Sequence, residues 1–199
     1  MDLLSDILGV MNLTGSLYFR SAFTAPWAIE VPNFEHVARF HYVHRGRCFV
    51  RLDGLSDPIP LEQGDLVIIN RGAAHTLCDP AHEPATALDQ VVERSGFKGR
   101  GALVFGGTDT GHQTQLICRH FAFDAHANHV LLDALPDAMH VRDYGKISPS
   151  WLDDTLKIIA TEVGGEHLGA DLIALRLSKV IWPKHCAFMY KTRALSIQA

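Results

Sequence analysis

Residues 61–75 read Leu61-Glu62-Gln63-Gly64-Asp65-Leu66-Val67-Ile68-Ile69-Asn70-Arg71-Gly72-Ala73-Ala74-His75, and this stretch decides the fold. Gly64-Asp65 predicts a tight turn into a short apolar strand. Gly72 predicts a second turn after that strand, because glycine adopts positive φ without a steric penalty. The stretch thus predicts a turn, a strand and a second turn that leads to His75.

Short β-rich runs flank this stretch on both sides. They cover residues 17–19, 27–31, 38–44, 48–52, 66–69 and 115–123. Turn residues separate them at the spacing of antiparallel hairpins in a sandwich or barrel. The alternation in residues 48–52 places Cys48, Val50 and Leu52 on one face, which we expect to be the barrel interior.

Helical periodicity lies mostly near the ends of the chain. It predicts helices over residues 2–11, 128–135, 149–163 and 169–182. The last helix carries an apolar stripe made of Leu172, Ile173, Leu177, Val180 and Ile181. We expect this stripe to form a symmetric dimer interface, although the helices can alternatively pack on their own barrel.

These elements predict a mainly β chain with accessory helices. We expect a barrel domain over residues 1–142, a two-helix dimerisation lobe over 143–183 and a disordered tail over 184–199. Residues 93–112 are rich in glycine, threonine and basic residues, so we expect a mobile loop or ragged hairpin that forms a candidate lid.

Composition restricts the possible functions. The 199 residues are 47% hydrophobic, which is enough for one sizeable core and a small appended lobe. The 18 basic and 22 acidic residues give a net charge of -4, so we expect no direct DNA binding. We find no signal peptide and no apolar run long enough to cross a bilayer. We therefore expect a cytoplasmic protein without membrane contact, whose four cysteines are free thiols.

Several segments resemble those of the cupins, and more narrowly the cupin-type effector domains of AraC-family transcription regulators. Residues 61–75 resemble the second cupin motif, with Asn70 in place of its proline, and residues 40–46 resemble the strand and turn of the first. The narrower resemblance rests on the ordered segments Leu17-Tyr18-Phe19-Arg20, Ala25-Pro26-Trp27-Ala28, Phe40-His41-Tyr42-Val43, Gly46-Arg47-Cys48-Phe49, Gly64-Asp65-Leu66-Val67 and Leu116-Ile117-Cys118. It spans residues 2–181.

The resemblance implies a cupin barrel, which is a double-stranded β-helix or jelly roll, with an N-terminal helix and two C-terminal helices. It also implies that the chain binds a small-molecule effector and forms a homodimer. In the family this domain normally precedes a pair of DNA-binding helix-turn-helix motifs, which have no counterpart in this sequence. We therefore expect the sensing domain of an AraC-type regulator, truncated or standing alone. Its effector can be a sugar, an aromatic acid or a fatty acid.

Four residues are candidates for the effector site: Trp27, Phe40, Tyr42 and His75. Together they offer apolar surface with a few polar groups, which is the usual composition of a ligand pocket. The alternative is that they only fill the core. For Tyr42 and His75 an effector can supply the hydrogen-bond partner that a buried hydroxyl or imidazole requires.

A metal-dependent enzyme of dioxygenase or isomerase type is an alternative function, and a pure protein-interaction module is another. Catalytic cupins normally hold their metal with a His-x-His and a Glu of the first motif and the His of the second. Here those first-motif positions fall near Asn33, Glu35 and Ala38. His36 is close to them, but with His75 alone it does not complete such a set. We expect no catalytic residues and no cofactor.

A zinc site is a weaker possibility. Cys48, His75 and Cys118 all have predicted inward positions, and thiolates with imidazole are typical zinc ligands. The competing interpretation is that the two cysteines fill core space as small apolar residues, which buried free cysteines commonly do. We favour that interpretation and therefore expect no metal.

Overall fold

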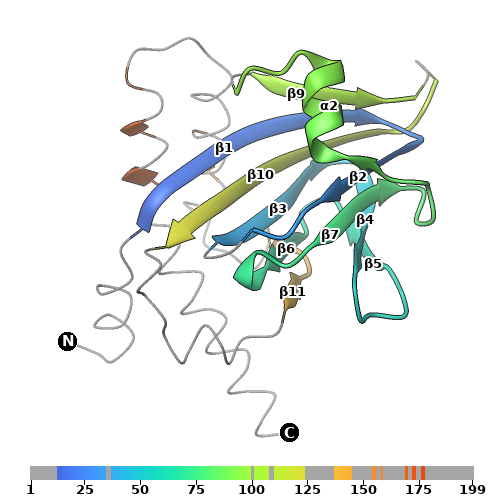
Figure 1. Ribbon diagram of the computed structural model, residues 1–199, viewed down its shortest axis with the longest axis horizontal. Coiled ribbons are helices and arrows are strands. Elements are labelled where there is room, and N and C mark those ends of the chain that lie inside the picture. Colours follow the sequence, from blue (N-terminus) through green and yellow to red (C-terminus); the bar gives the residue numbers. More distant parts are fainter. Residues whose placement is uncertain are drawn as a thin grey trace, which may run out of the picture.

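The computed structural model describes residues 13–34, 37–99, 101–107, 110–123 and 137–144, together with residues 154, 155, 158, 169, 172, 173, 176 and 177. Over these residues the chain forms two β-sheets that share one hydrophobic core (Figure 1). The predicted mainly β architecture is confirmed.

The larger sheet has six strands in the order β11-β6-β3-β10-β1-β9. They are β1 (Leu13–Thr24), β3 (Val37–Arg45), β6 (Leu66–Ile69), β9 (Ala102–Gly106), β10 (Gln113–Phe123) and β11 (Ala138–Val141). All neighbours pair antiparallel except β9, which runs parallel to β1. The long strands β1, β10 and β3 lie side by side in the middle of this sheet (Figure 1).

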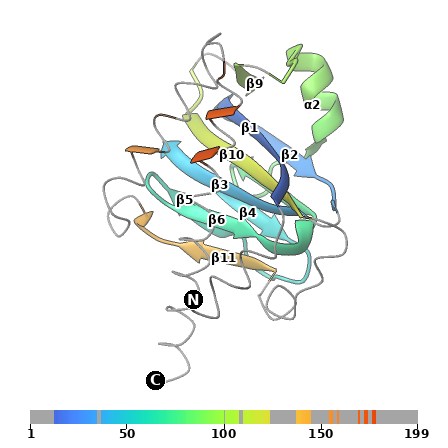
Figure 2. The same cartoon turned by 90° about the vertical axis from the view of Figure 1, so that its left-hand side faces the viewer.

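The smaller sheet has five strands in the order β5-β4-β7-β2-β8. They are β2 (Trp27–Val31), β4 (Arg47–Leu52), β5 (Ile59–Glu62), β7 (His75–Asp79) and β8 (Thr86–Ala87). Here β8 runs parallel to β2, and the other pairs are antiparallel. Figure 2 shows β9 and β11 at opposite edges of the larger sheet.

The segment between β8 and β10 differs from its prediction. Helix α2 (Leu88–Ser95) begins directly after β8, ends at Gly96, and contacts β2, β8 and β9. After it, β9 pairs with β1 rather than lying in a loop. Leu103 is only 1% exposed, whereas the adjacent Val104 is 61% exposed, so one face of β9 is part of the core. The burial of Leu103 accounts for the pairing of β9 with β1.

The core lies between the inner faces of the two sheets. On β4 the burial alternates, and Cys48, Val50 and Leu52 point inward as predicted. Strand β3 differs because both of its faces are buried from Ala38 to Val43. Its inner residues join the core, whereas Tyr42 lies on the outer face of the sheet, where its ring centroid is 6.5 Å from that of Tyr144.

The predicted turn at residues 64–65 is present and is held by a buried carboxylate. Gly64 has a φ of +95°, which favours glycine. The Asp65 carboxylate accepts hydrogen bonds from the backbone N–H groups of Glu62, at 3.1 Å, and Asp143, at 2.8 Å. The Nε2 atom of His140 lies 3.0 Å from it. Asp65 therefore ties β11 to this turn.

These contacts also determine the acidity of Asp65. Burial alone would raise its pKa, but the hydrogen bonds from Asp143, Glu62 and His140 outweigh burial and lower the pKa. The ionised carboxylate is consequently the form that stabilises the fold at neutral pH.

The predicted turn at Gly72 is also present, with a φ of +62°. It closes the short 3₁₀ turn η1 (Asn70–Gly72) between β6 and β7. The Gly72 carbonyl accepts a hydrogen bond of 3.0 Å from the N–H of Phe34. A Cβ at Gly72 would collide with the Phe34 carbonyl, so this close approach requires glycine. The turn therefore fixes the segment after β2 against the start of β7.

The predicted helices over residues 2–11 and 128–135 lie outside the described residues. Of the predicted helices over 149–163 and 169–182, the structure describes seven residues in helical conformation, namely 154, 155, 158, 172, 173, 176 and 177. In the predicted stripe, Leu172 is 57% and Ile173 is 40% exposed, Leu177 is half-buried, and Val180 and Ile181 are not described. Among the described residues, no helix is long and apolar enough to span a membrane.

Candidate functional site

A pocket with a volume of about 200 Å³ lies between the two sheets. Its lining comes from β1, β2, β3, β7, β9 and β10, with Leu88 of α2 and Phe34 of the segment after β2. The apolar lining residues include Phe23, Ile29, Val31, Leu77 and Leu103. The polar ones are Arg39 and His41 of β3 and Cys118, Arg119 and His120 of β10. The pocket is thus largely apolar, with its polar groups on one pair of strands.

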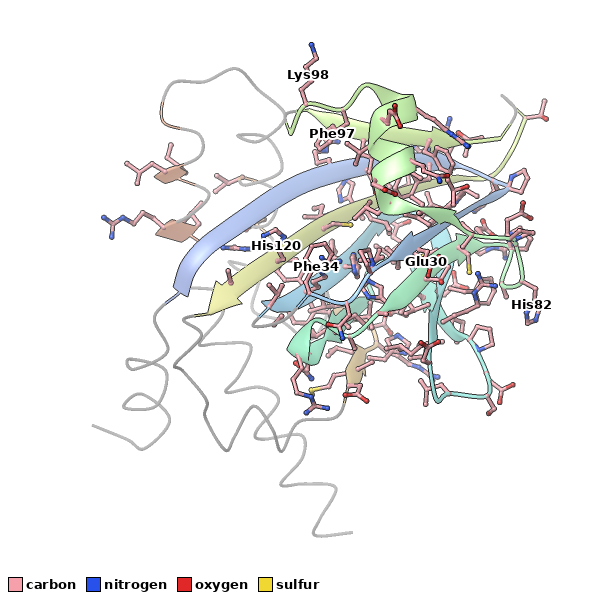
Figure 3. All side chains as sticks on the ribbon, viewed as in Figure 1. Glu30, Phe34, His82, Phe97, Lys98 and His120 are labelled. Carbon is pink, nitrogen blue, oxygen red and sulfur yellow. The ribbon has the colours of Figure 1, made fainter. Side chains whose placement is uncertain are left out.

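Cross-strand pairing places these polar groups together. In the antiparallel ladder between β3 and β10, Arg39 lies opposite His120 and His41 lies opposite Cys118. Residues two positions apart on a strand point to the same face of the sheet. The side chains of all four residues therefore lie on the inner face of the larger sheet. Figure 3 shows His120 and Phe34 close together near the middle of the view, whereas Lys98 and His82 lie at its periphery.

Two histidines and a cysteine form a buried hydrogen-bonded chain next to the pocket. The Nδ1 atom of His41 is 3.1 Å from the Sγ of Cys118, and its Nε2 is 2.9 Å from the Nε2 of His75. The Nδ1 atom of His75 is 2.9 Å from the carbonyl oxygen of Ala73.

The Ala73 carbonyl fixes the tautomers along this chain. A carbonyl only accepts, so the Nδ1–H of His75 donates to it and the Nε2 of a neutral His75 is left as an acceptor. The Nε2–H of His41 then donates to His75, and the Nδ1 of His41 accepts from the thiol of Cys118. With both imidazoles neutral and the thiol protonated, every member of the chain is therefore satisfied.

The environment favours these neutral forms. Burial, together with His75 and Arg39, holds the pKa of His41 well below its ordinary value. Burial also lowers the pKa of His75 to about 4, although its hydrogen bond to Ala73 opposes this shift. Burial raises the pKa of the Cys118 thiol to about 12. The chain is thus a neutral structural network at physiological pH.

Arg39 supplies a positive charge to the pocket. Its side chain is buried, with the whole residue 7% exposed, and its guanidinium lies 4.1 Å from the ring centroid of Phe34. Burial lowers its pKa to about 10, so it stays protonated at neutral pH. In the part of the chain that the structure describes, its Nε atom has no hydrogen-bond partner and no carboxylate forms an ion pair with it.

The positive charge also affects the neighbouring imidazole. Burial, followed by the charges of Arg39 and Arg119, lowers the pKa of His120, which is consequently neutral at pH 7. None of the described residues that line the pocket is acidic. The pocket thus combines apolar walls with an excess of positive charge.

The four residues predicted for the effector site are not brought together. Trp27 and His75 lie on inner faces, and His75 reaches the pocket only through His41. Phe40 and Tyr42 alternate with Arg39 and His41, so they lie on the outer face of β3. None of the four is among the residues that line the pocket. On β3 the structure instead places Arg39 and His41, the sequence neighbours of Phe40 and Tyr42, in the lining.

The three residues of the possible zinc site point inward, but they do not surround a common point. His41 lies between Cys118 and His75. The Nε2 atoms of the two histidines are at hydrogen-bond distance, closer than two ligands of one zinc ion, which are separated by about 3.3 Å. Among the described residues no group of three or more His, Cys, Asp or Glu side chains can hold a metal ion. The described donors do not fit a metal.

The first-motif positions offer no additional ligand in the described part of the chain. Asn33 is exposed at the end of β2, and Ala38 is buried on the outer face of β3. Glu35 and His36 lie outside the described residues. The catalytic cupin ligand set therefore has no counterpart among the residues that the structure describes.

Comparisons with known proteins agree with the geometry. A family model described as cupin matches residues 2–182. An AraC-like transcription regulator of Streptomyces antibioticus is 29% identical over 91% of this chain and 57% of its own length. Another, of Streptomyces lividans, is 31% identical over 71% of this chain and 44% of its own length. The chain thus spans about half the length of these curated relatives.

A solved structure supports the fold. A variant of ToxT from Vibrio cholerae in its apo form superimposes with a TM-score of 0.50 at 6% identity, covering 92% of this chain and 58% of that one. The AraC-like relatives confirm the resemblance drawn from the sequence. On the strength of the family match and the two-sheet fold, the chain belongs to the cupin family.

Proposed function

We propose that this chain binds a small-molecule effector in the pocket between its sheets and acts as the sensing domain of an AraC-type transcription regulator. The observation that carries the proposal is the pocket of about 200 Å³, whose apolar walls surround a few polar groups. The AraC-like relatives support the regulatory role. Because those relatives are named as regulators, we propose a non-enzymatic, cytoplasmic protein that needs no metal cofactor.

Thermal unfolding of the purified chain with a panel of sugars, aromatic acids and fatty acids tests this function. A ligand at 100 times its Kd stabilises the folded state by about 2.7 kcal/mol, which raises the Tm by several degrees in a chain of this size. We expect at least one compound of the panel to produce such a shift. A panel without any stabilising compound would contradict the proposal.

A matched pair of variants on β9 locates the site. Leu103→Phe adds volume inside the pocket and should abolish the ligand-induced shift, whereas Val104→Phe adds the same group on the exposed face and should retain it. Leu88→Trp, on the half-buried first residue of α2, fills the same pocket with less disturbance of the core. Equal ligand binding by all three variants would place the site elsewhere.

We also propose that the chain forms a homodimer through the apolar stripe predicted at Leu172, Ile173, Leu177, Val180 and Ile181. The exposure of Leu172 and Ile173 supports this proposal, as does that of Ile158, which is 50% exposed. Sedimentation at micromolar concentration should give a dimer. Leu172→Ser with Ile173→Ser should give a monomer, whereas Leu55→Ser, at an exposed position between β4 and β5, should not. A monomeric wild-type chain would refute the dimer.

A further inference from the structure

Resting on the proposed effector-binding function, we infer that the pocket takes a compact organic acid, whose carboxylate is bound by Arg39 and whose apolar body fills the space toward Leu77 and Leu103. The inference depends on a buried guanidinium beside an otherwise apolar cavity.

The charge of the site selects an anion. A buried cation without a counter-charge is costly, because burial removes its hydration without replacing it. Arg39 is in this situation among the described residues, where its Nε has no hydrogen-bond partner and its contact is with the face of the Phe34 ring. A ligand carboxylate would supply the missing charge and can accept two parallel hydrogen bonds from a guanidinium.

None of the described residues that line the pocket is acidic, so no carboxylate of the lining competes with a ligand for Arg39. The neighbouring polar groups are also suited to an anion. Both ring nitrogens of His41 are hydrogen-bonded, one with Cys118 and the other with His75. The imidazole therefore presents no lone pair to the pocket that would repel a ligand carboxylate. A cationic ligand would face the charge of Arg39 without any compensating group.

The volume restricts the size of the ligand. An apolar cavity of about 150 Å³ accommodates one benzene molecule, so a pocket of about 200 Å³ suits one ring or a short branched chain with its carboxylate, about ten non-hydrogen atoms in all. The lining also includes the apolar side chains of Leu77, Leu88 and Leu103. The site is therefore matched to benzoate- or phenylacetate-sized acids rather than to long-chain fatty acids or sugars.

Calorimetric titration of the whole chain tests the inference with matched pairs of probes: benzoate, phenylacetate and hexanoate, each against its neutral amide, with palmitate and glucose in addition. We expect at least one compact acid to bind at least tenfold more tightly than its amide, a difference of about 1.4 kcal/mol or more. We expect palmitate and glucose to bind more weakly than that acid.

Variants of Arg39 separate the contribution of its charge to the affinity from that of the apolar cavity. Arg39→Met should weaken the acid at least tenfold and leave the amide unchanged, and Arg39→Lys, which keeps the charge but not the two-pronged geometry, should give an intermediate affinity. Arg45→Met, at the exposed end of the same strand, is the control and should bind the acid like wild type. Circular dichroism and the amide affinity show whether each variant is folded.

The outcomes are distinguishable. Equal affinities for acid and amide, or an Arg39→Met variant that retains full acid affinity, would overturn the assignment of an organic acid while the proposed sensing function stands. Tighter binding of palmitate than of every compact acid would overturn the size restriction. If no probe binds and the wider panel of compounds also fails to stabilise the chain, both this inference and the proposed function are refuted.

Discussion

Acidification provides a quantitative test of the hydrogen-bonded chain formed by Cys118, His41 and His75. In the folded protein the pKa of His75 is lowered from 6.5 to about 4, chiefly because the imidazole is buried. The unfolded chain therefore binds the proton more tightly than the folded chain. The stabilisation is fully present above pH 6.5 and is lost as the pH falls from 6.5 toward 4.

The size of the loss of unfolding free energy follows from the shift in the pKa of His75. Each unit of pKa difference corresponds to about 1.4 kcal/mol, so protonation of His75 alone removes about 3 kcal/mol of unfolding free energy at pH 4. His41, whose pKa is also held low, acts in the same direction. A mesophilic domain is stable by about 5–15 kcal/mol, so this effect is large enough to measure.

Urea unfolding at a series of pH values between 7.5 and 4.5 measures this loss of unfolding free energy. His75→Gln keeps an acceptor for His41 but does not titrate, so its stability should depend less on pH than that of wild type. His82→Asn, which alters a histidine exposed after β7, should follow wild type. Parallel pH profiles for wild type and His75→Gln would refute the neutral, buried assignment of His75.

Three further predictions concern the turns and the thiol. Asp65→Ala should destabilise the fold by about 2–4 kcal/mol in urea unfolding, because it removes the carboxylate that accepts from the N–H groups of Glu62 and Asp143, whereas exposed Asp57→Ala should change stability by less than about 0.5 kcal/mol. Gly72→Ala should lower the free energy of unfolding more than Gly54→Ala does. Both glycines have positive φ, but of the two only Gly72 has backbone atoms where a Cβ would lie, so equal losses would contradict the close approach. Iodoacetamide at pH 8 should leave Cys118 of the native chain unmodified in peptide mass spectrometry, because burial raises its thiol pKa to about 12, and rapid alkylation would show that it is accessible.

The turns and strands around residues 61–75 could be predicted because glycine and alternation encode them locally. Gly64 and Gly72 both have positive φ, and Cys48, Val50 and Leu52 form the buried face of β4. Helix α2 was not predicted. It is short, and its position depends on packing its one fully buried residue, Val91, against the core. Such a contact between distant segments is not visible in local periodicity.

The pocket could be placed near β3 from sequence, but not on the face of the strand that lines it. A half-buried strand shows its inner face by alternation, whereas β3 is buried on both faces from Ala38 to Val43. Apolar Phe40 and Tyr42 were therefore the natural choice for the interior, although Arg39 and His41 occupy it. The cross-strand pairing of His41 with Cys118 identifies the inner face of β3. That pairing depends on a strand register, which the sequence alone does not specify.

The central claim is that a small molecule binds between the two sheets. The most direct test is methyl NMR of leucine-labelled protein during titration with the compound of the panel that stabilises the chain most. We predict that the methyl signals of Leu77, Leu88 and Leu103 shift and show NOEs to the ligand, while those of exposed Leu55 do not. Shifts at Leu55 with unchanged signals from the three pocket leucines would contradict the account.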